Sequence, residues 1–188
     1  MDQEEFRKLV LSELDAVHRL AYHLTFSTHE ADDLVQETYL RAFKSSGTFQ
    51  LTEHGPRPWL FKILHNVYRT RLSKRGREPG AAEDLEDQVA APPDPPPAEL
   101  DWEQMDERLK KAIEALSPAY RSVLLMWAVE GLKYREIAEV TGVAIGTVMS
   151  RLFRARQILC EQMTDLAAEY RLTPGRDAGS NGNAAAAE

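Results

Sequence analysis

Polar side chains that could hydrogen-bond DNA recur along residues 145–159. An apolar series at intervals of three or four residues predicts that this segment is an amphipathic helix with a buried stripe. The stripe consists of Ile145, Val148, Leu152, Ala155 and Leu159. The other faces carry Thr147, Ser150, Arg151 and Arg154. Such a helix can bind guanine edges or phosphates in a DNA major groove, although an ordinary helical hairpin with a solvated basic face has the same spacing.

The segments that precede this helix would have to hold it in a position where its polar face can reach DNA. A short apolar-periodic run at 137–140 is followed by Gly142, a residue type that tolerates a left-handed turn. Helix, tight turn and helix are therefore predicted. Ser117 and Pro118 have the types expected of an N-cap and a first helical residue, so a further helix should begin there and end at Gly131.

A second group of polar side chains lies on a helix expected to begin near Pro58. Lys62, Asn66, Arg69 and Ser73 follow at spacings of four, three and four, so they share one face. The helix dipole accounts for part of the basic character at the end of this helix. Asparagine is a mediocre helix former that can hydrogen-bond a base edge. Together with the loop that contains Phe49, Asn66 could hold an unstacked base.

Carboxylates cluster on the preceding predicted helix, for which Ser27 and Glu30 have capping-box spacing and which should end near Gly47. The acidic and amide side chains on its solvent side are Asp32, Asp33, Gln36 and Glu37. The helix dipole favours acids in a first turn. Glu37, however, lies four residues after Asp33, where like charges repel. A basic partner surface would relieve this repulsion.

The net charge of -7 over 188 residues is concentrated in one segment. Residues 79–107 contain ten acidic and no basic residues, whereas 1–78 and 108–188 are slightly basic, at +1 and +2. Both flanking parts can therefore present local basic faces to phosphate. Residues 79–98 include six prolines, which predicts an extended, disordered spacer. An acidic strand of this kind could also occupy a basic channel built for nucleic acid.

Helical periodicity with little period-2 alternation predicts an all-helical chain of two small domains joined by an extended acidic linker. One helix should run from the capping pair Asp2 and Glu5 to about Leu24, and another should open at Asp101 and continue to Leu116. The expected division places the first domain at 1–78, the linker at 79–107, the helix-turn-helix domain at 108–172 and a disordered tail at 173–188.

Several other classes of function find no support in the residues. The longest apolar run is far shorter than the ~20 residues that cross a bilayer. The amino terminus is acidic and Cys160 is the only cysteine, so a reducing cytoplasm is expected. His18, His23 and His29 are spaced by five and six residues, which separates their rings around a helix. We therefore expect no metal and no cofactor.

Three segments together resemble the extracytoplasmic-function (ECF) group of the bacterial sigma-70 family, over about residues 6–162. ADDLVQETYLRAF (31–43) resembles the segment that binds the clamp helices of RNA polymerase. PWLFKILHNVYRTRL (58–72) is similar to the helix that melts and reads the minus-10 element. LSPAYRSVLLMWAVEGLKYREIAEVTGVAIGTVMSRLFRARQIL (116–159) resembles the domain that reads the minus-35 element.

The resemblance implies a promoter-specificity subunit of core RNA polymerase with no covalent chemistry of its own, in a stress response and under a cognate anti-sigma factor. The minus-10 contacts would be Phe49, Lys62, Asn66 and Arg69. The minus-35 contacts would be Thr147, Met149, Ser150, Arg151, Arg154 and Arg156. The polymerase contacts would be Asp32, Asp33, Gln36 and Glu37. Met149 departs from the Lys or Arg often found at its place, which leaves an apolar contact such as a thymine methyl.

Three alternatives remain at this stage. A free-standing helix-turn-helix regulator would bind duplex DNA without polymerase. A helical hydrolase using Asp32, Asp33 and His29 would lack a phosphate-cradling loop, a paired nucleophile and a metal spacing. A pure adaptor would not depend on Asn66. Because both halves carry so little net positive charge, a chain that relies on polymerase for nonspecific DNA affinity fits best.

Overall fold

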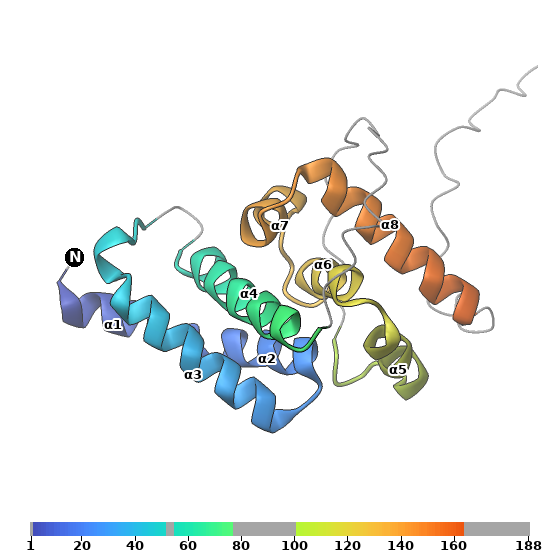
Figure 1. Ribbon diagram of the computed structural model, residues 1–188, viewed down its shortest axis with the longest axis horizontal. Coiled ribbons are helices and arrows are strands. Elements are labelled where there is room, and N and C mark those ends of the chain that lie inside the picture. Colours follow the sequence, from blue (N-terminus) through green and yellow to red (C-terminus); the bar gives the residue numbers. More distant parts are fainter. Residues whose placement is uncertain (1, 52–54, 77–100, 164–188) are drawn as a thin grey trace, which may run out of the picture.

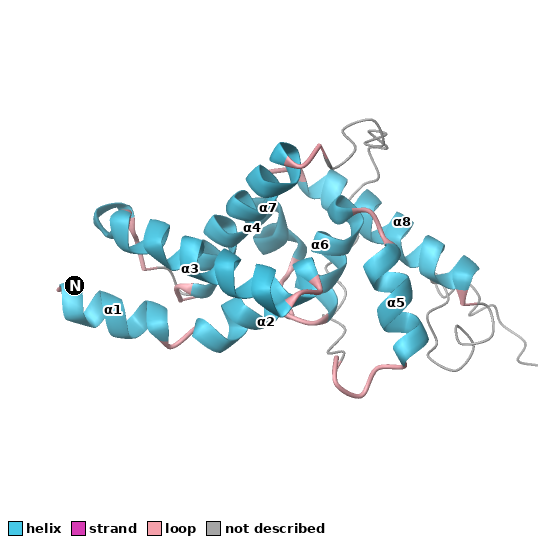
Figure 2. Cartoon of the chain, turned by 60° about the horizontal axis from the view of Figure 1, so that its bottom comes forward, coloured by secondary structure: helices cyan, strands magenta, loops and turns pink. Residues whose placement is uncertain are grey.

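Every regular element in the described residues, 2–51, 55–76 and 101–163 of the computed structural model, is helical (Figures 1 and 2). The predicted linker and the carboxyl-terminal tail lie outside these residues. The amino-terminal helices are α1 Gln3–Leu11, α2 Leu14–Thr25, α3 Thr28–Lys44, the 3-10 helix η1 Ser46–Thr48 and α4 Arg57–Lys74. The carboxyl-terminal helices are α5 Glu107–Ala115, α6 Pro118–Ala128, α7 Tyr134–Thr141 and α8 Ile145–Gln162.

The amino-terminal core lies between α2, α3 and α4. Leu20, Leu34 and Leu64, one from each helix, are fully buried there. Two tyrosines fasten the helices to one another, because Tyr39 donates its hydroxyl to the Val10 carbonyl at 2.9 Å and Tyr68 donates to a carbonyl of α2 at 3.1 Å. Buried phenols need such partners, so the two bonds fix how the helices meet.

The first predicted helix was wrong in its extent, because the chain breaks into α1 and α2 at Ser12 and Glu13. Asp2 and Glu5 do form the predicted capping box at the start of α1. The Ser12 hydroxyl donates to the Leu9 carbonyl at 2.8 Å. A side chain that bonds its own backbone in this way competes with the helix ladder, and apolar periodicity continues through such a break unchanged.

The helix predicted from Asp101 begins later, at Glu107. The Asp106 carboxylate caps α5 by accepting from the Arg108 backbone N–H at 2.8 Å, whereas Asp101 accepts from the Glu103 N–H and closes a separate turn. Both aspartates have the right type for an N-cap, so the sequence alone did not decide between them.

The predicted helix-turn-helix is confirmed. Gly142 follows α7 with φ of 72°, in the left-handed region, and its N–H donates to the Ala138 carbonyl at 2.8 Å. Along α8, Val148, Leu152 and Ala155 are buried against the rest of this half. The apolar stripe therefore packs inward as its spacing predicted.

The two halves pack directly against each other, α4 on α7 and α2 on α6, and we call this contact the seam. Figure 1 shows α4 lying between α3 and the carboxyl-terminal helices. Across the seam, Arg19 donates to both carboxylate oxygens of Glu130, at 2.9 and 2.6 Å, and the Glu130 side chain is 0% exposed. Arg121 also donates to the Tyr68 hydroxyl at 2.9 Å.

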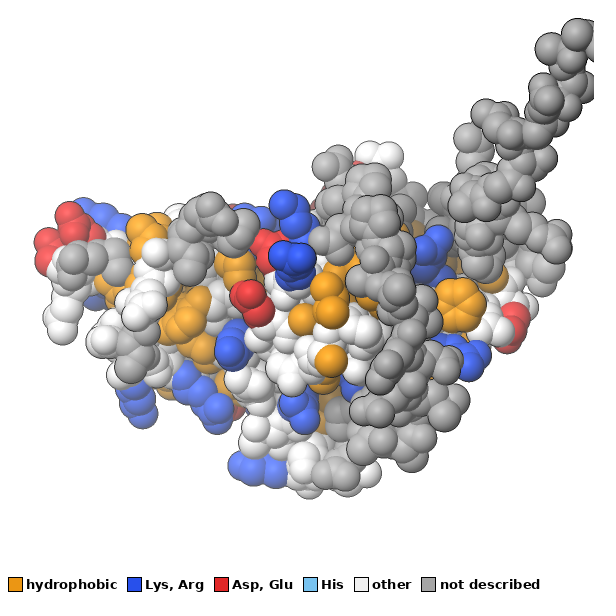
Figure 3. All heavy atoms as spheres, turned by 90° about the horizontal axis from the view of Figure 1, so that it is seen from above, with side chains coloured by type: hydrophobic (Ala, Val, Ile, Leu, Met, Phe, Trp, Pro, Cys, Tyr) orange, Lys and Arg blue, Asp and Glu red, His pale blue; other side chains and the backbone are white. Residues whose placement is uncertain are grey.

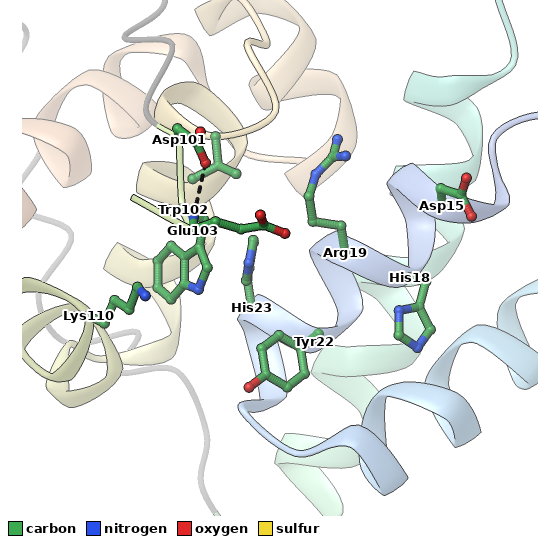
Figure 4. Close-up of a pocket in the computed structure, with 10 residues that line it drawn as sticks. Asp15, His18, Arg19, Tyr22, His23, Asp101, Trp102, Glu103 and Lys110 are labelled. Carbon is green, nitrogen blue, oxygen red and sulfur yellow. Dashed lines mark hydrogen bonds between the residues drawn. The ribbon is translucent and has the colours of Figure 1, made fainter. Parts of the chain in front are cut away.

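Trp102, from the turn that precedes α5, packs against α2 and lines a cavity at the seam. Its indole lies beside the His23 ring (Figure 4), with ring centroids 4.3 Å apart. The indole centroid is also 5.8 Å from that of Phe26. None of the described helices is both long and apolar enough to span a membrane.

Candidate nucleic-acid interface

The polar face of α8 is only partly open. Arg154 is exposed and donates to the Gln157 side chain at 3.0 Å. Thr147 and Ser150 are half-buried, and the Ser150 hydroxyl donates to the Thr147 carbonyl at 3.0 Å. Arg151 is half-buried and lines a cavity at the seam. The expectation of a solvent-open face therefore holds for Arg154 but not for the half-buried Thr147, Ser150 and Arg151, because helical spacing does not show what packs against a face.

Two further residues predicted on this surface have partners within the domain. The Arg156 guanidinium lies over the Trp127 ring, 5.7 Å from its centroid, a cation–π contact that holds the charge near the surface. Met149 is half-buried and packs against the core. Only part of the Met149 side chain is therefore left to meet another molecule.

On α4, Lys62, Asn66 and Arg69 are all exposed, as their spacing predicted. The opposite face of the helix supplies Leu60 and Leu64 to the core, so α4 is packed into the domain behind its polar side chains. On the face of the molecule in Figure 3, Lys and Arg side chains are spread over both halves, with apolar and acidic side chains between them.

Phe49, predicted beside a captured base, belongs to an aromatic cluster. Its ring centroid lies 5.3 Å from that of Phe6 on α1 and 4.9 Å from that of Trp59 on α4, both in edge-to-face geometry. Phe6 itself is 4% exposed. The ring of Phe49 therefore holds the chain at residue 49 against α1 and α4. Sequence reasoning missed Phe6 in this role, since it lies 43 residues before Phe49 and reads only as part of an apolar stripe.

The acidic surface of α3 differs from expectation in how its charges are balanced. Glu37 binds Arg41 at 2.6 Å and Arg71 at 2.8 Å, and Arg71 also donates to the Asp33 carbonyl at 3.0 Å. The hydrogen bond from Arg71 is the largest cause that lowers the pKa of Glu37 below its ordinary value, and Arg41 acts in the same direction. The repulsion between Asp33 and Glu37 is thus relieved inside the chain, and no partner is needed for it.

The remaining acidic and imidazole groups on this surface form pairs. The His18 ring lies 2.9 Å from an Asp32 carboxylate oxygen, and His29 lies 3.9 Å from Asp33. Gln36 is exposed. Within the described ranges, no three His, Cys, Asp or Glu side chains are grouped so that they could hold a metal ion.

The fold and these surfaces define a class of protein: a helical DNA-binding protein with a helix-turn-helix in one half and an exposed amide-and-cation face on a core-packed helix in the other. Family models match both halves. Residues 9–78 match "Sigma-70 region 2", and residues 106–159 match "Sigma-70, region 4".

Individual relatives agree with the family models. The chain is 36% identical over 165 residues to the ECF RNA polymerase sigma factor SigE of Mycolicibacterium smegmatis, covering 86% of this chain and 63% of that protein. It is 33% identical to the ECF RNA polymerase sigma factor EcfG of Rhodopseudomonas palustris, covering 83% of each.

A solved structure also matches, that of the sigma factor RpoE in complex with the anti-sigma factor NepR from Bartonella quintana. The TM-score is 0.64 at 30% identity, over 86% of this chain and 98% of that one. The chain belongs to the ECF sigma factors of the sigma-70 family. It is a non-enzymatic subunit that directs RNA polymerase in promoter-specific transcription initiation.

Proposed function

We propose that the two halves read separate promoter elements, α8 at the minus-35 element and α4 at the minus-10 element. The observation that carries this proposal is the exposed Lys62–Asn66–Arg69 face, presented by a helix whose other face is locked in the core. The domain division at 1–78, 79–107, 108–172 and 173–188 is part of the same proposal, and the matched ranges 9–78 and 106–159 support it.

At the minus-35 element, Ser150, Arg151 and Arg154 face the major groove, with Thr147 and Met149 beside them. Arg154 has the exposure needed to reach a guanine edge, and Arg156 lies on a phosphate while its guanidinium stays over Trp127. Arg151 reaches DNA only after the seam opens, because it is half-buried there.

At the minus-10 element, Asn66 hydrogen-bonds a base flipped out of the non-template strand, and Lys62 and Arg69 hold the backbone. A flipped base needs a wall to replace its stacking partners. Phe49 supplies that wall, since the cluster with Phe6 and Trp59 fixes this residue next to the amino-terminal end of α4.

The exposed side of α3 binds core polymerase through Asp32, Asp33, Gln36 and Glu37. Although they contact His18 and His29, the first two carboxylates keep 60% and 51% exposed side chains that a basic surface can reach, whereas Glu37 is held by two arginines. By analogy with the relatives, an anti-sigma factor regulates the chain in a stress response, and the chain works in the cytoplasm together with polymerase.

Run-off transcription with purified core polymerase on a promoter library tests the proposal. Asn66→Ala should lose selectivity at one minus-10 position, whereas Ser73→Ala, an exposed change on the same helix, should keep it. A pure adaptor predicts no loss from Asn66→Ala. Tight, specific binding of the chain to duplex DNA without core polymerase would instead favour a free-standing regulator.

The minus-35 assignment is tested by the sequence dependence of Arg154→Ala. If Arg154 makes a bidentate base contact, the change costs about 1–3 kcal/mol at one base pair. Lys111→Ala removes an exposed cation from α5 and should affect all sequences equally or not at all. An equal loss on every sequence from Arg154→Ala would assign this side chain to phosphate.

A further inference from the structure

His65 is an ionisable residue buried where the two halves meet. It lies on α4 between the exposed residues Asn66 and Lys62, yet its own side chain faces the seam and it is only 6% exposed. Its Nδ1 atom has no hydrogen-bond partner among the described residues. A buried ring nitrogen without a partner is unusual, because such groups are costly to desolvate.

The cavity at His65 has a volume of about 190 Å³ and is bounded by four helices from both halves. The polar and charged groups that face it are Tyr68 and Arg69 from α4, Ser122 from α6, Thr141 from α7 and Arg151 from α8. The described lining therefore contains two guanidinium groups and no carboxylate. An imidazolium ion formed here would meet no carboxylate among the described lining residues and would be repelled by Arg69 and Arg151.

The closed seam is incompatible with reading both promoter elements at once. The numbers in the names minus-10 and minus-35 place the elements about 25 base pairs apart. This is roughly 85 Å of duplex at ~3.4 Å per base pair. In the closed form, Arg69 of the minus-10 face and Arg151 of the minus-35 face line the same small cavity. The halves must separate before each can reach its element, a requirement that rests on the residue placement given under Proposed function.

We propose that the seam is a proton-sensitive latch, which holds the two halves together while His65 is neutral and opens when His65 is protonated. Opening exposes the ring to water, and it moves Arg151 away from Arg69 and frees both for DNA.

The direction of the effect follows from where the proton binds more tightly. Burial, followed by the charges of Arg69 and Arg151, lowers the pKa of His65 to about 4 in the closed form. In the open form the ring is solvated and returns to an ordinary pKa near 6.5. The open form therefore binds more protons, and the closed form loses stability as the pH falls below 6.5. Between pH 7.5 and pH 5, His65 should shift the equilibrium roughly 30-fold toward the open form.

A second buried histidine, His23, lies at the other end of the seam. Burial lowers its pKa to about 4, and Arg19 and Lys110 act in the same direction. Besides His23 itself, the charged and ionisable groups lining its cavity are Asp15, His18, Arg19, Tyr22, Asp101, Glu103 and Lys110 (Figure 4). His23 therefore favours the open form in acid as His65 does, and its Nδ1 atom also has no hydrogen-bond partner among the described residues. We assign the latch to His65 because its cavity holds both Arg69 and Arg151, one from each DNA-reading face, and the His65→Gln comparison separates its contribution from that of His23.

The test is single-molecule energy transfer in the full chain, without polymerase or DNA. Dyes are attached at Lys44→Cys and Glu139→Cys, exposed positions on α3 and α7, after Cys160→Ser removes the native thiol. The open-to-closed ratio should rise between pH 7.5 and pH 5. His65→Gln should remove roughly 30-fold of that rise. His29→Gln changes an 88% exposed histidine away from the seam and should leave the rise in the open-to-closed ratio unchanged.

The latch is refuted if the ratio does not change with pH, or if it changes equally in the wild-type chain and in His65→Gln. Should His65→Gln fail to fold by circular dichroism, NMR titration of His65 in the wild-type chain decides: a pKa well below 6.5 in the closed form supports the latch, and an ordinary pKa overturns it. Because neither measurement involves DNA, loss of the latch would leave the promoter assignments to their own transcription assay.

Discussion

Replacement of Glu130 by Gln should weaken the contact between the two halves more than any exposed charge change. Glu130 keeps its shape in this variant but loses its negative charge opposite Arg19. The two bonds between them are 2.9 and 2.6 Å long, and the carboxylate is 0% exposed, whereas Arg19 is 45% exposed. The carboxylate also raises the pKa of Arg19, chiefly through this hydrogen bond.

The magnitude follows from the unequal burial of the two partners. Breaking a fully buried pair costs about 3–5 kcal/mol because the remaining charge is stranded. Arg19 is nearly half exposed and can be rehydrated, and the Gln amide oxygen can still accept one bond. We therefore expect a loss of about 1–3 kcal/mol in the free energy of unfolding.

Urea unfolding followed by circular dichroism measures this loss. A double-mutant cycle with Arg19→Gln isolates the coupling between the two side chains. Glu4→Gln is the matched control, since the Glu4–Lys8 pair is 3.9 Å apart and 67% and 77% exposed. Such a pair should contribute less than about 0.5 kcal/mol. Equal, small losses in Glu130→Gln and Glu4→Gln, with no coupling to Arg19, would refute the reasoning.

Three further outcomes follow from the described contacts. Tyr68→Phe removes the hydroxyl that donates to the Leu24 carbonyl and accepts from Arg121, so it should cost about 1–3 kcal/mol in urea unfolding. Gly142→Ala should cost about 1–2 kcal/mol, measured in the same way, because φ is 72° and the new Cβ meets no atom within 4 Å, so that only backbone strain acts. Glu37→Gln should flatten the decline of stability with acid below about pH 4.5: the lowered pKa of Glu37 means that its stabilisation is present above that pH and is lost as the pH falls. If stability declines equally with acid in the wild-type chain and in Glu37→Gln, then Arg71 and Arg41 contribute nothing to stability through Glu37.

Much of the local structure was predictable from short-range signals. Asp2 and Ser27 cap helices where their types and spacings predicted, and Gly142 makes the turn of the helix-turn-helix. The exposure of Lys62 and Asn66 could be predicted from the apolar spacing within one helical turn before and after each residue. These signals act within a few residues, so the chain itself contains all the information that they need.

The sequence by itself determined an all-helical chain, the helix-turn-helix, and which face of α4 and α8 is polar. The tertiary structure alone decided that Arg71 neutralises Glu37, that Phe6 packs against Phe49, and that Arg151 turns toward the seam. Arg19 and Glu130 are 111 residues apart in sequence, and no local pattern pairs them. The physical reason is range: caps and periodicity depend on neighbours along the chain, whereas burial and ion pairing depend on neighbours in space.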